Sequence, residues 1–234
     1  MDKYKLKIVD IIDEAYGVKS YNFEKPADLD WLEGAHVHIA HIGYDEGELP
    51  NKELIRHMSI TTLPTEAKIG ITTKVPGSNS LFKKKLNELK LGDEIIFFKF
   101  GSRMYLRRAN RPLIVLSMGV GMSTVRPMLL AFIKDSSEIP YLMNINVNST
   151  GEYLFRNELD PYTGDTFIAH WLKSREDFTD LLNTMPYEEN PIFYIVGSDE
   201  FMKGNIKFLN GKGVPNEDII LDRKQEKLIE YFTD

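Results

Sequence analysis

A glycine-rich turn in the middle of the chain, Gly119-Val120-Gly121-Met122-Ser123-Thr124, constrains the fold most strongly. It follows the apolar run Leu113–Leu116, which predicts a buried strand, and it precedes a helix-forming stretch that begins at Arg126. A strand that breaks into glycines before a helix exposes backbone N–H groups where a phosphate is favoured. A third glycine is absent, so the Gly-x-Gly-x-x-Gly pattern is incomplete. Because about half of the chain precedes the turn, we expect another domain before the nucleotide-binding one.

Composition excludes several classes of function. The 234 residues carry a formal net charge of −6, which gives no reason to expect nucleic acid or an anionic membrane as a partner. The absence of cysteine excludes disulfides, thiolate zinc sites, cysteine-ligated iron–sulfur clusters and a cysteine nucleophile. The chain starts without an apolar signal region, and no apolar run approaches the ~20 residues of a membrane span. We therefore expect a cytoplasmic protein that does not insert into a membrane.

The first half of the sequence predicts an antiparallel β-barrel. Short segments rich in β-branched or aromatic residues lie at 5–9, 36–40, 68–73 and 94–98, and Gly, Pro and Asp occur between them. One helix is predicted from Ser80 to Lys90, with Leu81, Phe82, Leu86 and Leu89 on its apolar side and Gly92 after its end.

The second half predicts a parallel sheet covered by helices on both faces. Apolar strands, at 113–117, 141–147, 166–171 and 192–196, alternate with helical stretches near 125–133, 176–182 and 200–210. Pro127 is expected in the first turn of its helix, where proline is tolerated. We place the boundary so that residues 1–108 form the barrel domain and residues 109–234 the α/β domain.

Two segments of the first half have the chemistry of a dinucleotide site. Arg56 offers a planar cation that can bind a diphosphate bidentately, and the hydroxyl of Ser59 can hydrogen-bond the polar edge of a flavin. The loop 77–80 directly precedes the predicted helix, so its N–H groups and hydroxyls favour a phosphate. The alternative is structural: Arg56 pairs with a carboxylate of the barrel, and the loop only caps the helix.

Taken in this order, the motifs resemble the ferredoxin–NADP reductase superfamily over nearly the whole chain. Arg56-His57-Met58-Ser59 is similar to the family's Arg-x-Tyr-Ser flavin motif, and Gly77-Ser78-Asn79-Ser80 to its Gly-x-x-Ser phosphate loop. Residues 119–126 resemble the nicotinamide-nucleotide loop, and residues 152–159 resemble a segment between the second and third strands of that domain. Residues 196–202, which begin Val196-Gly197-Ser198, resemble the Cys-Gly-Pro/Ser motif.

The resemblance implies FAD rather than FMN as the bound flavin, and NADPH or NADH as the electron donor. The candidate flavin-binding residues are Arg56, His57, Met58, Ser59, Thr62, Thr72, Lys74, Gly77, Ser78, Asn79 and Ser80. The candidate nicotinamide-nucleotide residues are Gly119, Val120, Gly121, Met122, Ser123, Thr124, Ser174, Arg175, Gly197 and Ser198. Ser59 is the one catalytic candidate, as a hydrogen-bond partner of the flavin N5.

Ser174 and Arg175 bear on the choice of nucleotide. In NADPH-using relatives a Ser and an Arg in this region bind the 2′-phosphate, although NADH-using relatives often keep a similar pair. No acidic residue ends the second strand of this half, where Asn146 and Asn148 stand. Both observations favour NADPH over NADH.

Three departures from the family pattern stand out. Met58 replaces the tyrosine that usually packs on the flavin, and Val196 replaces the cysteine near the nicotinamide. Many relatives end in an aromatic residue that covers the flavin, whereas here Tyr231 and Phe232 follow a charged stretch. The changes at Met58 and Val196 affect the expected geometry and rate of hydride transfer more than cofactor binding, and whether Tyr231 or Phe232 covers the flavin stays open.

Other side chains have simpler interpretations. His36, His38 and His41 carry no metal prediction, because no third ligand on the same face is apparent and zinc needs three or four. The lysine run 83–85 and the cluster Arg103, Arg107, Arg108 and Arg111 are interpreted as solvated surface, or else as a docking patch for an acidic electron carrier.

The resemblance implies a flavin-dependent oxidoreductase that passes hydride from NAD(P)H to FAD and electrons to a separate soluble acceptor, such as ferredoxin, flavodoxin or a small molecule. One alternative is a ferric-chelate or siderophore reductase on the same fold. Another is a flavin-binding electron-transfer subunit of a larger complex that does not itself oxidise a nicotinamide.

Overall fold

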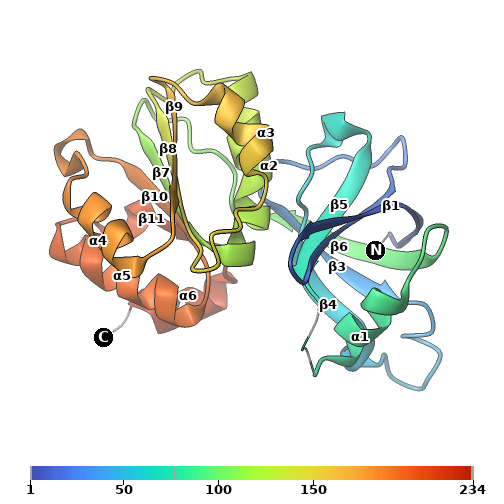
Figure 1. The fold of residues 1–234 in the computed structure, drawn as a ribbon. Helices are drawn as coiled ribbons and strands as arrows, with labels where there is room; N and C mark the ends of the chain where they lie inside the picture. Colours follow the sequence, from blue (N-terminus) through green and yellow to red (C-terminus); the bar gives the residue numbers. More distant parts are fainter. Residues whose placement is uncertain (1, 76, 78, 233–234) are drawn as a thin grey trace. The chain divides into compact units, whose positions relative to one another are not determined.

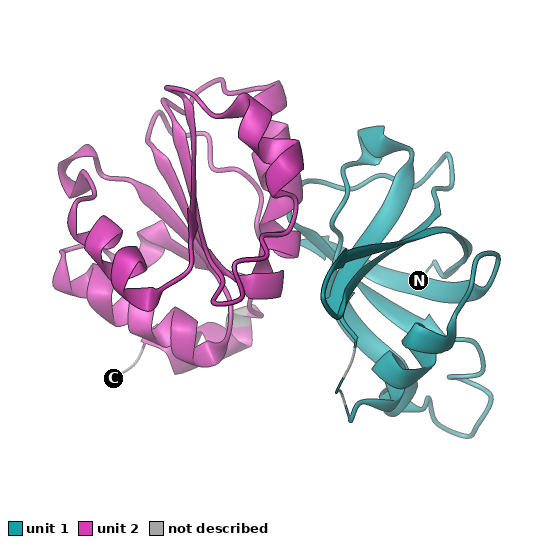
Figure 2. Cartoon of the chain, viewed as in Figure 1, with its two compact units in different colours: residues 1–102 teal, residues 103–234 magenta. Residues whose placement is uncertain are grey.

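The computed structural model describes residues 2–75, 77 and 79–232, and the chain divides into two compact units (Figures 1 and 2). Unit 1 comprises residues 1–102 and unit 2 residues 103–234. Among the described residues, no helix is long and apolar enough to cross a membrane.

Unit 1 is an antiparallel β-structure. Its described strands form a six-stranded sheet of order β4-β3-β6-β1-β2-β5. Their bounds are β1 Tyr4–Ala15, β2 Val18–Glu24, β3 Ala35–His41, β4 Ile55–Ser59, β5 Lys68–Lys74 and β6 Glu94–Ser102. The sheet curls so that the segment after β4 reaches β5, where the Thr61 N–H donates to the Gly70 carbonyl at 2.8 Å. Alternate side chains then enclose a core that includes Phe23, Val37, Ile71 and Phe97.

One helix, α1 (Leu81–Glu88), accompanies this sheet. Phe82 and Leu86 lie four residues apart on its buried side and pack into the core of unit 1, as their spacing predicts. The helix ends before Leu89, two residues earlier than predicted, because Leu89 takes an extended conformation.

Unit 2 is a parallel α/β structure. Over the described residues its sheet has five strands, in the order β11-β10-β7-β8-β9, and every pair is parallel. The strands are β7 Leu113–Met118, β8 Leu142–Val147, β9 Phe167–Leu172, β10 Ile192–Val196 and β11 Ile219–Leu221. The helices are α2 Met122–Lys134, α3 Arg156–Leu159, α4 Arg175–Asn183, α5 Asp199–Gly211 and α6 Gln225–Phe232. Figure 1 shows α2 and α3 on one face of the sheet and α4, α5 and α6 on the other.

The two units meet in sequence between Ser102 and Arg103, a few residues before the predicted boundary at 108 and 109. The residues after Arg103 bond to unit 2. The Tyr194 hydroxyl accepts from the Arg107 N–H at 2.9 Å and donates to the Tyr105 carbonyl at 2.8 Å. Tyr194 is fully buried in β10, so these bonds attach the segment to an inner strand of the sheet.

Candidate functional site

In unit 1, strand β4 and the loop before α1 come together through Arg56. Its Nη2 donates to the Ser80 Oγ at 2.7 Å, and its guanidinium lies 5.8 Å from the centre of the Phe82 ring. Ser80 is the residue before α1, where the helix presents unpaired N–H groups. Gly77 and Asn79 are exposed in the same loop, and Ser78 lies outside the described residues. The structure therefore joins the two predicted flavin motifs, which are 24 residues apart in sequence.

Two lysines complete a cationic cluster at this loop. Lys83, on the first turn of α1, donates from Nζ to the carbonyl of Lys74 at the end of β5, at 2.8 Å. Burial lowers the pKa of Lys83, and the nearby charges of Arg56 and Lys74 lower it further. Among the described residues, Arg56, Lys74 and Lys83 form no ion pair with a carboxylate. The interpretation of Lys83 as a solvated side chain is thus wrong, because it is half-buried beside two other cations.

Strand β4 carries the rest of the predicted flavin motif. Met58 packs against the core of unit 1, so its thioether contacts the barrel side chains. Ser59 is half-buried and lies opposite His36 of β3 in the strand register. His57 is exposed on the same face as Ser59, with its ring centre 4.4 Å from that of His36 and 5.3 Å from that of His38.

The three imidazoles form a cluster that the sequence did not reveal, because His57 joins it only through the pairing of β3 with β4. Among the described residues, no group of three His, Cys, Asp or Glu side chains is arranged to hold a metal ion. His41 faces the other way, and its Nε2 bonds to the Phe82 carbonyl at 2.9 Å. Burial lowers the pKa of His41.

Two predicted flavin-binding residues use their hydroxyls inside unit 1. The Thr62 Oγ1 donates to the Lys68 carbonyl at 3.0 Å and accepts from the Gly70 N–H at 2.9 Å. The Thr72 Oγ1 shares a 2.6 Å hydrogen bond with the Ser20 Oγ across the β2–β5 pair. Both threonines are buried, and both stabilise the strand pairing.

In unit 2, the glycine turn lies at the carboxyl end of β7, as predicted. Residues Gly119–Gly121 form a single 3-10 turn that runs directly into α2 at Met122. Gly121 packs so closely on β10 that a Cβ there would lie 2.8 Å from the Val196 carbonyl oxygen. The Ser123 Oγ donates to the Val120 carbonyl at 2.8 Å, which tightens the turn. Val120 stands partly exposed at its tip, and Met122 and Thr124 are buried.

Helix α2 starts four residues before the predicted Arg126, because the turn passes into helix without a break. The expectation that Pro127 lies in the first turn is therefore wrong: it is the sixth residue of α2. Arg126 is buried and makes a two-point ion pair with Glu158 of α3, with Nε 2.7 Å from Oε2. The segment 152–159 is thus attached to α2 through Glu158.

The second turn of unit 2 follows β10. A Cβ at Gly197 would lie 2.6 Å from the Phe201 ring, so only glycine leaves room for α5 here. The Ser198 Oγ caps α5 by accepting from the Phe201 N–H at 3.2 Å. The Gly119 and Gly197 turns therefore meet at one edge of the sheet, through the contact of Gly121 with Val196. The carboxyl edge of parallel strands is where such sheets bind their ligands.

The C-terminal aromatic residues belong to the core of unit 2. Tyr231 is buried in α6, and its hydroxyl donates to the Asp199 Oδ1 at 2.6 Å and accepts from the Arg223 Nε at 2.8 Å. The bond from Tyr231, followed by a 3.0 Å bond from the Arg223 Nη2 to the Asp199 Oδ1, holds the pKa of Asp199 below its usual value. Phe232 is half-buried against the same core.

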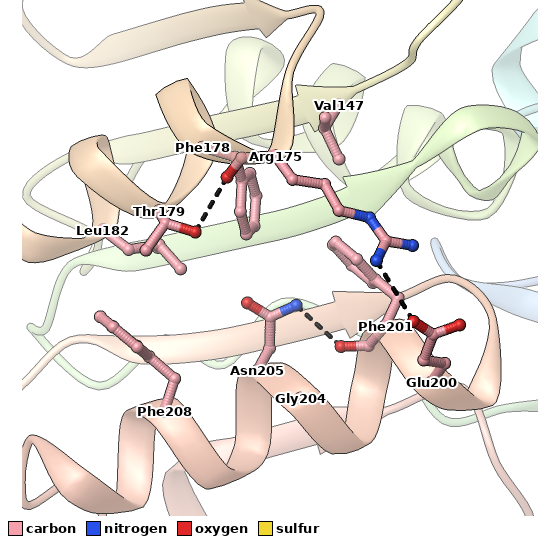
Figure 3. Close-up of a pocket in the computed structure, with 10 residues that line it drawn as sticks. All are labelled: Val147, Arg175, Phe178, Thr179, Leu182, Glu200, Phe201, Gly204, Asn205 and Phe208. Atoms are coloured by element: carbon pink, nitrogen blue, oxygen red, sulfur yellow. Dashed lines mark hydrogen bonds and ion pairs between the residues drawn. The ribbon is translucent and has the colours of Figure 1, made fainter.

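A pocket of about 280 Å³ opens between α4 and α5, next to the last residue of β8 (Figure 3). Phe178, Phe201 and Phe208 form much of its wall. Arg175 and Glu200 lie together at one end, with the Arg175 Nη1 3.2 Å from the Glu200 Oε1. Ser174 is the residue before α4. Over the described residues its hydroxyl bonds to Asp177 alone: it donates to the Oδ2 at 2.7 Å and accepts from the backbone N–H at 3.0 Å.

The arginines near the unit boundary are bonded within unit 2. Arg111 makes a two-point ion pair with Asp218, at 2.8 and 2.6 Å. Arg108 donates to the carbonyls of Asp135 and Ser137, and Arg107 donates to that of Glu217. Three members of the predicted basic patch therefore stabilise the fold of unit 2, so the interpretation of this cluster as solvated surface is wrong for them.

Comparison with known proteins gives matches to solved structures alone. No family model and no curated protein matches the sequence. The ferredoxin reductase in carbazole 1,9a-dioxygenase is 15% identical, with a TM-score of 0.76 over 94% of this chain and 68% of that chain. The ferredoxin-NADP+ reductase from Plasmodium falciparum is 17% identical, with a TM-score of 0.75 over 94% and 95% of the two chains.

A third match is the flavohem-like FAD/NAD binding domain of nitric oxide dioxygenase from Vibrio cholerae O1 biovar El Tor. It is 19% identical, with a TM-score of 0.69 over 93% of this chain and 97% of that chain. At this level of identity the likeness establishes the fold. The predicted fold class is confirmed: an antiparallel barrel followed by a parallel-sheet domain, as in ferredoxin reductases.

Proposed function

We propose that this chain is a flavin-dependent reductase that takes hydride from a reduced nicotinamide nucleotide and passes electrons to a separate acceptor. The observation that carries the proposal is the cationic cluster of Arg56, Lys74 and Lys83 at the N-terminus of α1, which has no carboxylate partner among the described residues. Burial and the neighbouring charges of Arg56 and Lys74 lower the pKa of the half-buried Lys83, and cations gathered without a carboxylate favour a polyanionic ligand. The fold, with two turns at the carboxyl edge of a parallel sheet, supplies the second nucleotide site.

The residues of unit 1 fit the diphosphate of FAD. Arg56 has a planar fork that can bind two phosphate oxygens, and its bond to Ser80 already fixes its direction. Lys83 and the N–H groups of the first turn of α1 would add charge and donors on the same side. We assign Ser59, on the same strand as Arg56, as the hydrogen-bond partner of the flavin N5. When bound, FAD supplies the chemistry: it accepts hydride and releases electrons one or two at a time.

The residues of unit 2 fit the nicotinamide nucleotide. The N–H groups of the turn 119–124 would bind its diphosphate at the start of α2. We place the adenosine end in the pocket between α4 and α5. Its volume of about 280 Å³ lies near the lower limit of roughly 300 Å³ for small-molecule sites, so it has room for one ring system and not for a dinucleotide. The phenylalanine rings of its wall offer an apolar surface to a planar base.

The electron acceptor is proposed by analogy with the ferredoxin reductases of the same fold. A soluble protein such as ferredoxin or flavodoxin is the first candidate. Purified holoprotein assayed with these proteins, and with ferric chelates, will identify the acceptor by the rate of NAD(P)H oxidation.

Anaerobic mixing of the flavin-loaded protein with NADH or NADPH tests the proposal. Bleaching of the visible flavin absorbance by either nucleotide is expected. If neither nucleotide bleaches a bound flavin, the reductase proposal is wrong and an electron-transfer subunit becomes the better description.

A substitution at Gly204 tests the assignment of the pocket. Gly204 of α5 lines the pocket, and a Cβ there would meet nothing within 4 Å. We expect Gly204→Leu to fill the pocket and to raise the KM for the nucleotide roughly 10-fold or more. If the base can no longer be buried in the pocket, the complex loses about 1.5 kcal/mol of binding free energy. Gly211→Leu is the matched control, because Gly211 lies on the same helix with open space around it. Equal KM values for the two variants would contradict the assignment of the adenosine end to this pocket.

A further inference from the structure

The mouth of the pocket between α4 and α5 carries an acidic side chain where the sequence pattern favours a phosphate-binding arginine. Arg175 is engaged by Glu200, at 3.2 Å, and these side chains come from different helices, 25 residues apart in sequence. Figure 3 shows the guanidinium and the carboxylate side by side at one end of the pocket.

We propose that Glu200 is a specificity-determining residue that makes this chain select NADH over NADPH. The inference rests on the proposed function and deepens it, because it names the nucleotide that the pocket accepts. It also reverses the preference for NADPH that Ser174 and Arg175 suggest when they are considered as sequence alone.

The first argument is the state of the two phosphate-binding candidates. Ser174 donates its hydroxyl proton to the Asp177 carboxylate and accepts from the Asp177 N–H, so the hydroxyl is committed to capping α4. Arg175 shares its guanidinium with Glu200. Both groups that would grip a 2′-phosphate therefore already have an acidic partner.

The second argument is charge. A 2′-phosphate would bring about 1.5 to 2 negative charges beside the carboxylates of Glu200 and Asp177. The Arg175–Glu200 pair is exposed, with side-chain exposures of 74% and 78%, so Arg175 can turn toward a phosphate at little cost. The Glu200 carboxylate would then remain unpaired next to that phosphate, and like charges in contact are unfavourable.

The third argument is the chemistry of the unphosphorylated ribose. A ribose 2′-hydroxyl is a hydrogen-bond donor, and a carboxylate is an acceptor of such bonds in NAD sites. That acceptor usually follows the second strand of the sheet, where this chain has Asn146 and Asn148. Here Glu200 reaches the pocket from the start of α5, after the fourth strand in sequence order. Glu200 would accept the hydrogen bond of the 2′-hydroxyl in place of an acidic residue after the second strand.

Isothermal titration of the flavin-loaded protein with 5′-AMP and with 2′-phospho-AMP tests the inference, because these probes carry the adenosine end and no nicotinamide. We expect 5′-AMP to bind roughly 2- to 5-fold more tightly than 2′-phospho-AMP, because one exposed charge contact contributes up to about 1 kcal/mol. Glu200→Gln is expected to abolish or reverse this ratio. Glu217→Gln, an equal charge change before β11 at the opposite edge of the sheet, should leave it unchanged.

A second substitution distinguishes the mechanism from a general change of charge. The gain of 2′-phospho-AMP binding in Glu200→Gln should disappear in the double variant Glu200→Gln, Arg175→Ala, because Arg175 is the group that Glu200 holds. A gain that persists without Arg175 would overturn the assignment.

Failure of this inference and failure of the proposed function give different results. If both probes bind the wild-type protein equally, or if Glu200→Gln leaves their ratio unchanged, the selection by Glu200 is wrong and the reductase proposal stands. If neither probe binds and neither NADH nor NADPH bleaches the flavin, the nucleotide site itself is absent and both proposals fail.

Discussion

The two units prepare for a negatively charged ligand in opposite ways. In unit 1, Arg56, Lys74 and Lys83 gather at the start of α1 without a carboxylate partner among the described residues. In unit 2, the arginines near the carboxyl edge of the sheet are all paired, in Arg126–Glu158, Arg175–Glu200 and Arg223–Asp199. Arg56 and Lys83 are therefore hydrogen-bonded to neutral oxygens and meet no described opposite charge, whereas those arginines of unit 2 are neutralised by carboxylates.

This difference fits a resident cofactor in one unit and an exchanging substrate in the other. A ligand that relieves repulsion among clustered cations, of which Arg56 and Lys83 are half-buried, gains affinity from each charge, and this favours retention through many turnovers. A ligand that meets arginines already paired gains little from them, so it binds through N–H groups and apolar contacts and can leave. The oxidised nucleotide must leave before the next donor can bind, and weak electrostatic attraction to the paired arginines allows it to dissociate.

The largest effect is expected when the cationic cluster is broken at its centre. Arg56→Ala removes the only guanidinium of the cluster and its bond to Ser80. Hydrogen bonds to charged groups contribute about 1.5–3 kcal/mol, so the Kd for FAD should rise roughly 10- to 100-fold. The amount of FAD that the protein loses during dialysis, measured by the fluorescence of the free flavin, reports this change.

Lys84→Ala is the matched control for Arg56→Ala. Lys84 is an exposed cation of the same helix and makes no ion pair with a described carboxylate. Equal loss of FAD from the two variants would mean that the net charge of α1, and not the cluster around Ser80, holds the cofactor.

Much of this architecture could be predicted from local sequence. β10 was predicted with its bounds, and β5 to within one residue, because short runs of β-branched residues between breakers leave few alternatives. β2 and β4 were missed, since their polar residues, as in Arg56-His57-Met58-Ser59, hide the alternation. α6 was missed because charged residues surround its apolar positions.

The site was predicted less completely than the fold, because its charges meet only in three dimensions. The resemblance predicted Arg56 and Ser80 as site residues, whereas the burial of Lys83 depends on the approach of α1 to the end of β5. No role was predicted for Glu200, although it lies in the segment 196–202 that resembles a family motif, because its partner Arg175 is on another helix. Local patterns predict which atoms are available, and tertiary contacts decide which of them are neutralised.

A smaller effect is expected at the point where the two turns of unit 2 touch. Gly121→Ala places a methyl group 2.8 Å from the Val196 carbonyl oxygen, and a backbone atom cannot move away cheaply. We expect a loss of about 1–3 kcal/mol in the free energy of unfolding of unit 2, together with a raised KM for the nucleotide. Gly211→Ala, in open space on α5, should cause neither change. Urea unfolding followed by circular dichroism separates the outcomes, and an unaffected Gly121→Ala would mean that the turns are not tightly packed.

The smallest effect concerns acid sensitivity beside the cationic cluster. His41 bonds to the Phe82 carbonyl of α1, and burial lowers its pKa, with Lys85 adding a smaller effect in the same direction. Since the pKa is lower in the folded than in the unfolded state, the stability contribution is complete above the unfolded value of about 6.5 and is lost as the pH falls through the folded value. One group can change the free energy of unfolding by at most about 1.4 kcal/mol per pH unit.

His41→Gln keeps a donor for the carbonyl and cannot titrate, so the variant should lose less stability than the parent between pH 7 and pH 5. Trp31 fluorescence in a Trp171→Phe background reports unit 1 alone, because Trp31 is buried there and donates to the Thr62 carbonyl. If the free energy of unfolding falls equally with pH in parent and variant, protonation near α1 is tolerated. The charge sensitivity that distinguishes unit 1 from unit 2 would then be confined to the cationic cluster at the loop before α1.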